Sequence, residues 1–193
     1  MLVCEPGRQR DPATRPLRMT PDVRAAQAGD ADARDRVLRA FWPRAYRLAY
    51  AVLGNRAAAE DAAQEALILA AARLNSLREP EAFDVWSARI VVNAARSAAR
   101  RRRSERSLDG AHAVARFDDD AVVRLDVAQA LAALPSWLRE PVVLRYVEGF
   151  SSAQIGASLG APAATIRFRL LLARRRLATA LADRVRVAEE YAR

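Results

Sequence analysis

The sequence predicts an all-α protein made of two small helical domains joined by a short flexible linker. The chain has 193 residues, enough for one ordinary domain or two small ones. Alanine fills 44 positions while aromatic residues make up only 6%, and alanine has the highest helix propensity. Apolar residues recur at three- and four-residue steps between residues that start and stop helices. We therefore expect helices that pack closely through small side chains.

Charge divides the chain into the same parts. The net charge is +9, and all basic residues are arginine. Residues 25–103 and 121–193 each carry +5, whereas residues 104–120 carry −3. The positive balance favours a polyanionic partner. The exclusive use of arginine also fits the codon usage of a GC-rich genome, so it is weak evidence of function.

Five segments follow from composition and charge. Prolines and a glycine crowd the first 18 residues, which is typical of disorder, and Met19 is an alternative start of the chain. The acidic stretch has weak periodicity and predicts a linker. We expect a disordered N-terminal extension at 1–21, a first domain at 22–103, an acidic linker at 104–121, a second domain at 122–182 and a C-terminal tail at 183–193.

The first basic block begins with two predicted helices. Asp30 is a suitable N-cap for the first of them. Pro43 lies either at a break or in the first turn of the next helix. That helix carries Tyr46, Leu48, Tyr50 and Leu53 and ends at Gly54, a residue that favours helix termination.

Two longer helices complete the first block. The third is expected at 57–74, where acidic residues in the first half suit the helix dipole. The fourth is expected at 81–103, after a loop at 75–80, and ends in an arginine cluster. Four apolar residues of the third helix form one predicted stripe: Leu67, Ile68, Ala71 and Leu74. Four residues of the fourth lie on or near one face: Phe83, Trp86, Ile90 and Asn93.

The second block predicts a compact helical unit. Helices are expected at 122–134, 137–147 and 153–159, with the last capped by a Ser-Ser pair. A tight Gly-Ala-Pro turn precedes a final helix that runs from 163 to Leu177 or to Leu181. A helix, a short glycine-containing turn and an arginine-rich helix form the helix-turn-helix pattern. Its core-facing residues would be Ile166, Leu170 and Leu177.

Three segments in this order and spacing carry a family resemblance. They are EDAAQEALILAAARL, EAFDVWSARIVVNAARSAARRRR and LPSWLREPVVLRYVEGFSSAQIGASLGAPAATIRFRLLLARRRL. The chain resembles the extracytoplasmic-function (ECF, group IV) class of bacterial RNA polymerase sigma factors, over the sigma-2 domain at about 22–103 and the sigma-4 domain at 122–182. A helix-turn-helix alone occurs in many repressors, whereas the paired segments are far more specific.

The resemblance implies a transcription initiation factor that has no catalytic activity of its own. Such a factor binds core RNA polymerase through the β′ coiled coil and the β flap, places sigma-4 on the −35 element and sigma-2 on the −10 element of promoter DNA, and helps to open the duplex. An anti-sigma factor is the expected regulator. Two alternatives are a stand-alone helix-turn-helix repressor and a basic amphipathic protein of the membrane surface.

The resemblance implies that the third predicted helix docks on the β′ coiled coil. The core-polymerase-binding residues would be Asp61, Gln64 and Glu65, on its polar face. The alternative is a solvated acidic helix start. Because acidic groups repel DNA, a protein partner is the more economical explanation.

The fourth predicted helix would bind the −10 element, with the loop at 75–80 as a base pocket. Opening the duplex and capturing an extruded base requires apolar or aromatic walls against which the base packs, amide groups that read its edge, and cations that bind the phosphates. Trp86 would supply a wall, although the residues themselves favour core positions for Trp86 and Phe83. Asn93 lies near the middle of this predicted helix. It is hard to explain as a packing residue, because a buried amide demands hydrogen-bond partners. The −10 residues would be Trp86, Asn93, Arg96, Arg100 and Arg101.

The last predicted helix would enter the major groove at the −35 element. The −35 residues would be Thr165, Arg167, Arg169, Arg174 and Arg175. The chain departs from the family here: Phe168, Leu171 and Leu172 replace small polar, aromatic and basic residues, and Gln154 and Gly156 replace the usual Glu and Ala. Either the element differs, or this helix binds more through phosphates and DNA shape, or the apolar residues contact another protein.

Other classes of function are disfavoured. Cys4 and His112 are the only cysteine and histidine, so a disulfide framework, a metal centre or a cofactor is not expected. No catalytic constellation or Gly-rich phosphate loop is present. The longest apolar run, at 66–72, is too short to cross a bilayer, and no signal peptide is recognisable. We expect a cytoplasmic protein.

Overall fold

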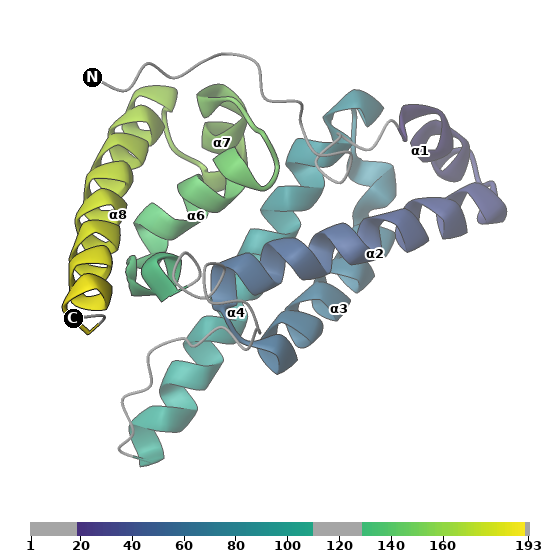
Figure 1. Ribbon diagram of the computed structural model, residues 1–193. Coiled ribbons are helices and arrows are strands. Elements are labelled where there is room, and N and C mark those ends of the chain that lie inside the picture. The colour runs from purple at the N-terminus through teal and green to yellow at the C-terminus, as the bar shows by residue number, and fades with distance from the viewer. Residues whose placement is uncertain (1–18, 110–128, 192–193) are drawn as a thin grey trace.

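The computed structural model describes residues 19–109 and 129–191, with side chains at 19–104 and 129–182 (Figure 1). Throughout this part of the chain the regular elements are α-helices or short 3-10 helices, which confirms the all-α prediction. No helix in the described ranges is long and apolar enough to span a membrane. The expectations for Cys4, for His112 and for most of the linker lie outside the described residues.

Helix α1 (Thr20–Gln27) begins two residues before the expected start of the first domain. Val23 and Ala26 are buried against the rest of the domain. The side-chain Nε2 of Gln27 donates hydrogen bonds to the carbonyl oxygens of Leu74, at 2.9 Å, and Leu77, at 2.7 Å. This short helix therefore fixes the loop that precedes the fourth predicted helix.

Helix α2 (Ala31–Leu53) confirms the predicted N-cap, because Asp30 Oδ1 accepts a hydrogen bond from Ala33 N at 2.9 Å. The predicted break at Pro43 is wrong, since the helix continues through this residue. A proline inside a helix costs about 3 kcal/mol. Phe41 before it and Leu48 after it are both buried on one face, so core packing offsets that cost.

Helix α3 (Arg56–Arg73) is capped by Asn55 and packs between α2 and helix α4 (Phe83–Asp109). Its buried face consists of alanines, which lets the neighbouring backbones approach closely: Ala58, Ala59, Ala62, Ala63, Ala66 and Ala70. The predicted stripe is wrong at Ile68, which is 69% exposed. The alanine face, not the large apolar residues, points to the core.

Two short 3-10 helices, η2 (Leu74–Ser76) and η3 (Pro80–Ala82), lead into α4. Phe83 is buried and meets Phe41 edge to face, with ring centroids 5.9 Å apart. Helix α4 extends six residues beyond the expected end of the first domain at 103. No glycine or proline occurs before Gly110 to stop it.

The second domain contains a helical segment at 129–133 and helices α6 (Ser136–Tyr146), α7 (Ser152–Leu159) and α8 (Ala163–Tyr191). Helix α8 continues through much of the expected C-terminal tail. Ser151 and Gln154 form a capping box at the start of α7.

The turn between α7 and α8 explains a departure from the family pattern. Gly160 has φ 68°, which favours glycine. A Cβ atom on Gly156 would lie 2.4 Å from the carbonyl oxygen of Ala161. An alanine there would force the turn apart, so this turn conformation requires glycine at 156.

The two domains pack against each other. Helix α6 contacts α2, and α7 contacts α4 (Figure 1). Buried residues of both domains belong to one continuous hydrophobic cluster, which includes Val91 in the first domain and Leu144 and Ile155 in the second. The described structure is therefore a closed arrangement of the two domains.

Candidate polymerase and nucleic-acid interfaces

The outer face of α3 carries the residues predicted to bind the polymerase. Asp61 and Gln64 are exposed, and Glu65 is half-buried. Ile68 lies four residues after Gln64 and seven after Asp61, so it shares their face and is 69% exposed. This face of α3 therefore combines an apolar side chain with acidic and amide groups, as protein interfaces do.

The predicted polymerase face and the predicted −10 face meet at one ion pair. Arg101 Nη2 on α4 lies 3.2 Å from Glu65 Oε2 on α3. The Arg101 and Glu65 side chains are 54% and 38% exposed, so this pair contributes little to stability. Both groups can therefore change partners when a ligand binds.

Trp86 and Phe83 occupy different environments at the start of α4. Phe83 is buried in the core, which confirms the core alternative for that residue. Trp86 is half-buried, with its ring centroid 5.8 Å from that of Phe83. Part of the indole ring remains available to a base.

Asn93 is exposed, so it is not a core packing residue. Water can satisfy the amide, and no packing explanation is needed. Arg89, Arg96 and Arg100 lie four residues before, three after and seven after it on the same face. Sequence reasoning missed the exposed Arg89, although its spacing from Asn93 could have revealed it. The outer face of α4 is thus a column of cations with one amide among them.

Arg96 is held by a partner that the sequence did not predict. Its Nε donates to Glu140 Oε1 at 2.9 Å and its Nη2 to Glu140 Oε2 at 2.5 Å. Glu140 lies on α6 and is only 2% exposed. The hydrogen bond to Glu140 raises the pKa of Arg96 above its ordinary value. A group proposed to bind DNA is therefore engaged by the second domain.

Arg44 forms a second buried link between the domains. It is 7% exposed and donates to Asp84 Oδ1 on α4 and to Glu148 Oε2, each at 2.6 Å. Its guanidinium also lies over the ring of Phe150, 5.9 Å from the centroid. Since Glu148 and Phe150 follow α6, one arginine of α2 joins three segments.

Arg139 on α6 completes the contact. It donates hydrogen bonds to the carbonyl oxygens of Val52, at 2.8 Å, and Leu134, at 2.8 Å, and to that of Ala132. These are carbonyl groups at or near helix ends, which otherwise need other partners. Burial lowers the pKa of Arg139 from its ordinary value. On the α7 side, Ser158 Oγ donates to the carbonyl oxygen of Val85 at 3.2 Å.

Helix α8 presents its arginines on the surface. Arg167, Arg174 and Arg175 are exposed, while Thr165 and Arg169 are half-buried. Ile166 and Leu170 are buried beneath them, and Leu177 is half-buried, as predicted. The five predicted −35 residues therefore lie on one helix and start within its first turn.

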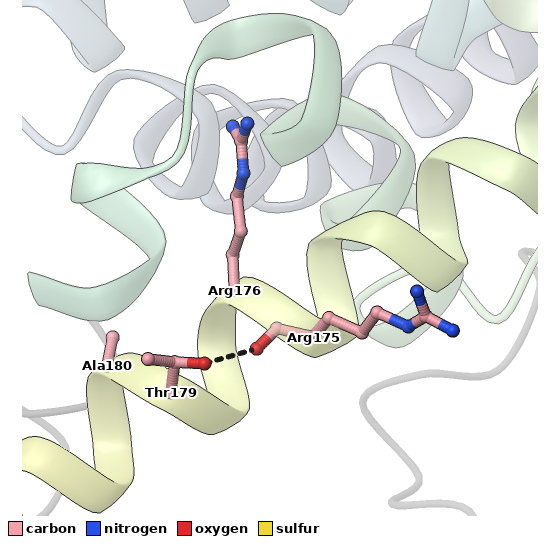
Figure 2. Close-up of a pocket in the computed structure, with 4 residues that line it drawn as sticks. All are labelled: Arg175, Arg176, Thr179 and Ala180. Atoms are coloured by element: carbon pink, nitrogen blue, oxygen red, sulfur yellow. Dashed lines mark hydrogen bonds between the residues drawn. The ribbon is translucent and has the colours of Figure 1, made fainter.

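Arg175 and Arg176 diverge farther along α8. Figure 2 shows Arg176 reaching toward α6 and Arg175 pointing away from it, beside an open hollow that Thr179 and Ala180 also line. The Arg176 guanidinium lies 5.9 Å from the ring centroid of Trp137, an arrangement that fits a cation-π interaction. Arg175 remains free to meet an anion, whereas Arg176 is used within the domain.

A metal site is not evident among the described residues, because no three histidine, cysteine or acidic side chains at 19–104 or 129–182 could hold an ion together. The described chemistry is instead that of charged and apolar helix faces.

Comparisons with known proteins agree with these features. The family model "Sigma-70 region 2" matches residues 37–105 and "Sigma-70, region 4" matches residues 124–177. ECF RNA polymerase sigma factor SigW of Bacillus subtilis is 29% identical over 178 residues, covering 83% of this chain and 95% of that protein. ECF RNA polymerase sigma factor SigM of Mycobacterium tuberculosis is 33% identical, covering 80% of each chain.

A solved structure of a sigma factor is also similar to the described fold. The sigma factor RpoE in complex with the anti-sigma factor NepR, from Bartonella quintana, matches with a TM-score of 0.66 and 27% identity, covering 77% of this chain and 96% of that chain. Helix α7, the turn and the first half of α8, up to residue 177, lie within the region 4 match. The chain therefore belongs to the ECF class of the sigma-70 family, and is a non-enzymatic factor that directs transcription initiation by RNA polymerase.

Proposed function

We propose that the outer faces of α3, α4 and α8 bind, respectively, core RNA polymerase, the −10 element and the −35 element of a promoter. The observation that carries this proposal is the segregation of charge on exposed helix faces. Acidic and apolar groups gather on α3, and cations gather on α4 and α8. DNA attracts the second kind of surface and repels the first.

The polymerase surface consists of Asp61, Gln64 and Glu65, with Ile68 one turn farther along α3 on the same face. It would dock on the β′ coiled coil, while the sigma-4 domain contacts the β flap. Ile68 supports this assignment, because it adds an exposed apolar side chain to the polar groups of the same face, and protein interfaces combine apolar and polar contacts. Acidic groups around an apolar contact add specificity and speed of association.

The −10 surface consists of Trp86, Asn93, Arg96, Arg100 and Arg101. A partly exposed indole, an exposed amide and three arginines supply stacking, base-edge hydrogen bonds and phosphate contacts. The loop at 75–80, which Gln27 fixes from below, would hold an extruded base.

The −35 surface consists of Thr165, Arg167, Arg169, Arg174 and Arg175. These residues extend from the N-terminal turn of a recognition helix, the part that enters the major groove. Arginines can contact phosphates along the groove or guanine edges within it.

Regulation by an anti-sigma factor belongs to the same proposal. RpoE, which this chain resembles, was solved with the anti-sigma factor NepR. A partner that covers the α3 and α8 surfaces would block the polymerase and DNA together. Because the proposed partners are core polymerase and the chromosome, this activity would take place in the cytoplasm.

In vitro transcription with purified core polymerase on a genomic promoter library tests the proposal. We expect the protein to produce start sites that core polymerase alone does not use. If no new start sites arise in the absence of any anti-sigma factor, the proposal fails. Tight binding of promoter duplex without polymerase would instead indicate a stand-alone repressor.

Asp61→Arg is expected to weaken binding to core polymerase about 10- to 100-fold, because like charges brought together at an interface cost several kcal/mol. Fluorescence anisotropy with labelled sigma factor measures this change. Asp35→Arg on α2 is the matched control, since Asp35 is an exposed acid outside the proposed surface. Equal weakening by both variants would contradict the assignment of the α3 face.

Asn93→Ala is expected to slow promoter opening up to about tenfold, which corresponds to one lost hydrogen bond, with little change in polymerase binding. Permanganate reactivity of unpaired thymines measures opening. Gln64→Ala also removes an exposed amide from a helix, but from the polymerase surface. It should weaken assembly and leave opening by the assembled complex unchanged. Identical behaviour of the two variants would contradict both assignments.

A further inference from the structure

The outer face of α8 carries two large apolar side chains that no core contact explains. Phe168 is 64% exposed and Leu171 is 48% exposed. They are three residues apart, so they lie next to each other on one face. On the opposite face of α8, Ile166 and Leu170 pack in the core and are 0% and 2% exposed. The exposed pair therefore faces away from its own domain.

Exposed arginines flank this apolar pair. Arg167 adjoins Phe168 in sequence, and Arg175 follows Leu171 by four residues on the same face. A ligand for this surface must combine negative charge with a small apolar feature. The DNA major groove does so, because phosphates line its edges and the C5-methyl groups of thymine lie on its floor.

The chemistry of the pair limits what it can recognise. Phe and Leu side chains neither donate nor accept hydrogen bonds, so they cannot read the polar pattern of a base edge. They can distinguish thymine by its methyl group, a known use of apolar residues in the major groove. Phe168 is the sixth residue of α8 and Leu171 the ninth, within the turns that a recognition helix inserts.

We propose that Phe168 and Leu171 read thymine methyl groups in the −35 element, so that part of promoter specificity comes from apolar contact. This inference rests on the proposed role of α8 in binding the −35 element. It assigns base specificity to the two positions that lack polar groups and leaves phosphate binding to the arginines. A protein occupant would need acidic groups to match the arginines, and the experiment below distinguishes it.

The experiment starts with holoenzyme, that is, core polymerase with the full-length chain. Bound promoters are selected from a library randomised over the upstream element. Each thymine in a selected element is then replaced singly by deoxyuridine, which keeps every hydrogen-bonding group and removes only the methyl. We expect at least one replacement to weaken binding about fourfold, the effect of one buried methyl-sized group.

Phe168→Ala and Leu171→Ala then test the assignment. At one position of the −35 element, each variant should bind DNA with thymine and DNA with deoxyuridine equally well. The salt dependence of DNA binding, which reports phosphate contacts, should stay the same as in the parent protein. Because both side chains are exposed, thermal melting should match the parent protein. Tyr146→Ala is the control: it removes a side chain that is 60% exposed on α6, outside the recognition helix, and should keep the discrimination.

The outcomes distinguish a failure of this inference about Phe168 and Leu171 from a failure of the proposed function. If holoenzyme forms and selects promoters but never distinguishes thymine from deoxyuridine, the inference is wrong and the proposed function stands. The same holds if Phe168→Ala and Leu171→Ala both discriminate as the parent does, or if they impair holoenzyme assembly whatever the DNA, which would indicate a protein occupant. If no promoter is selected at all, the proposed function itself fails.

Discussion

Arg44→Leu is expected to lower the free energy of unfolding of the closed two-domain structure by about 3–5 kcal/mol, the usual cost of removing one partner from a buried ion pair. The Arg44 and Glu148 side chains are each 8% exposed, and that of Asp84 is 15% exposed. In the variant the two carboxylates keep their desolvation cost and lose their shared cation. A leucine of suitable size cannot replace the hydrogen bonds that Arg44 donates.

Domain-specific fluorescence measures this effect during urea unfolding. Trp42 and Trp86 report the sigma-2 domain, and Trp137 reports the sigma-4 domain. In a Trp137→Phe background, the transition midpoint of Arg44→Leu should fall well below that of the parent. Arg39→Ala is the matched control, because Arg39 pairs with Asp35 at the surface of the same helix, with exposures of 82% and 65%. Its expected change is within about 0.5 kcal/mol.

A double-mutant cycle tests the cause. If the uncompensated carboxylate of Glu148 is responsible, Glu148→Gln should recover part of the stability in the Arg44→Leu background and cost stability in the parent. Independent, additive effects would show that the loss arises from packing around Arg44. A midpoint equal to that of Arg39→Ala would contradict the role of the buried network altogether.

The sequence allowed a largely correct prediction of the fold because local chemistry determines the helix ends. Asp30 and Ser151 act as the predicted N-caps, and Gly160 takes the left-handed conformation that ends α7. These signals need only a few neighbouring residues. The order of the helices and the helix-turn-helix followed from them.

Other features depend on tertiary packing and were not predictable from local signals. Pro43 resembles a helix break, but Phe41 and Leu48 bury the same face on either side of it and keep the helix continuous. Ile68 resembles a core residue, but the alanines of α3 already fill the core face. On α3, whose core face is filled by alanines, a large apolar residue is therefore not necessarily a core residue.

The links between the domains were also beyond sequence analysis. Arg44 and Glu148 are 104 residues apart, and Arg96 and Glu140 are 44 apart. No helical period relates residues so distant. One signal was present nevertheless: Glu140 is the only acidic residue of α6, directly before the apolar run that begins at Pro141, and an acid that becomes fully buried usually has a paired partner. The residues proposed to bind DNA were identified by type and spacing, but not the partner that holds Arg96.

The contact between Arg96 and Glu140 limits how the closed chain can bind a promoter. Elements centred at −35 and −10 are about 25 base pairs apart, or about 85 Å at 3.4 Å per pair. A compact chain of this length is only about 40 Å across. The closed arrangement therefore cannot contact both elements, and Arg96 cannot bind Glu140 and a phosphate with the same donors. The domains must separate before the proposed surfaces can act together.

Glu140→Ala is therefore expected to shift the equilibrium between closed and open chains about 10- to 100-fold toward the open form, because it removes the charge-assisted hydrogen bonds to Arg96. Arg96, already 35% exposed, can turn to water, so no buried cation is left behind. The variant retains the buried apolar contacts within each domain. It should open rather than unfold.

Energy transfer between dyes on the two domains measures the opening. Cysteines at Ala72 and Ala178, both exposed, would carry the dyes in a Cys4→Ser background. We expect lower transfer efficiency for Glu140→Ala than for the parent, and tighter binding of the free protein to promoter DNA. Glu81→Gln is the control, since Glu81 pairs with Arg24 inside the sigma-2 domain and at its surface. Unchanged transfer efficiency in Glu140→Ala would mean that the other links between the domains, at Arg44, Arg139 and Ser158, keep them closed without the Arg96 pair. Opening without a gain in DNA binding would mean that Arg96 is not a DNA contact, since the open variant leaves its donors free for a phosphate.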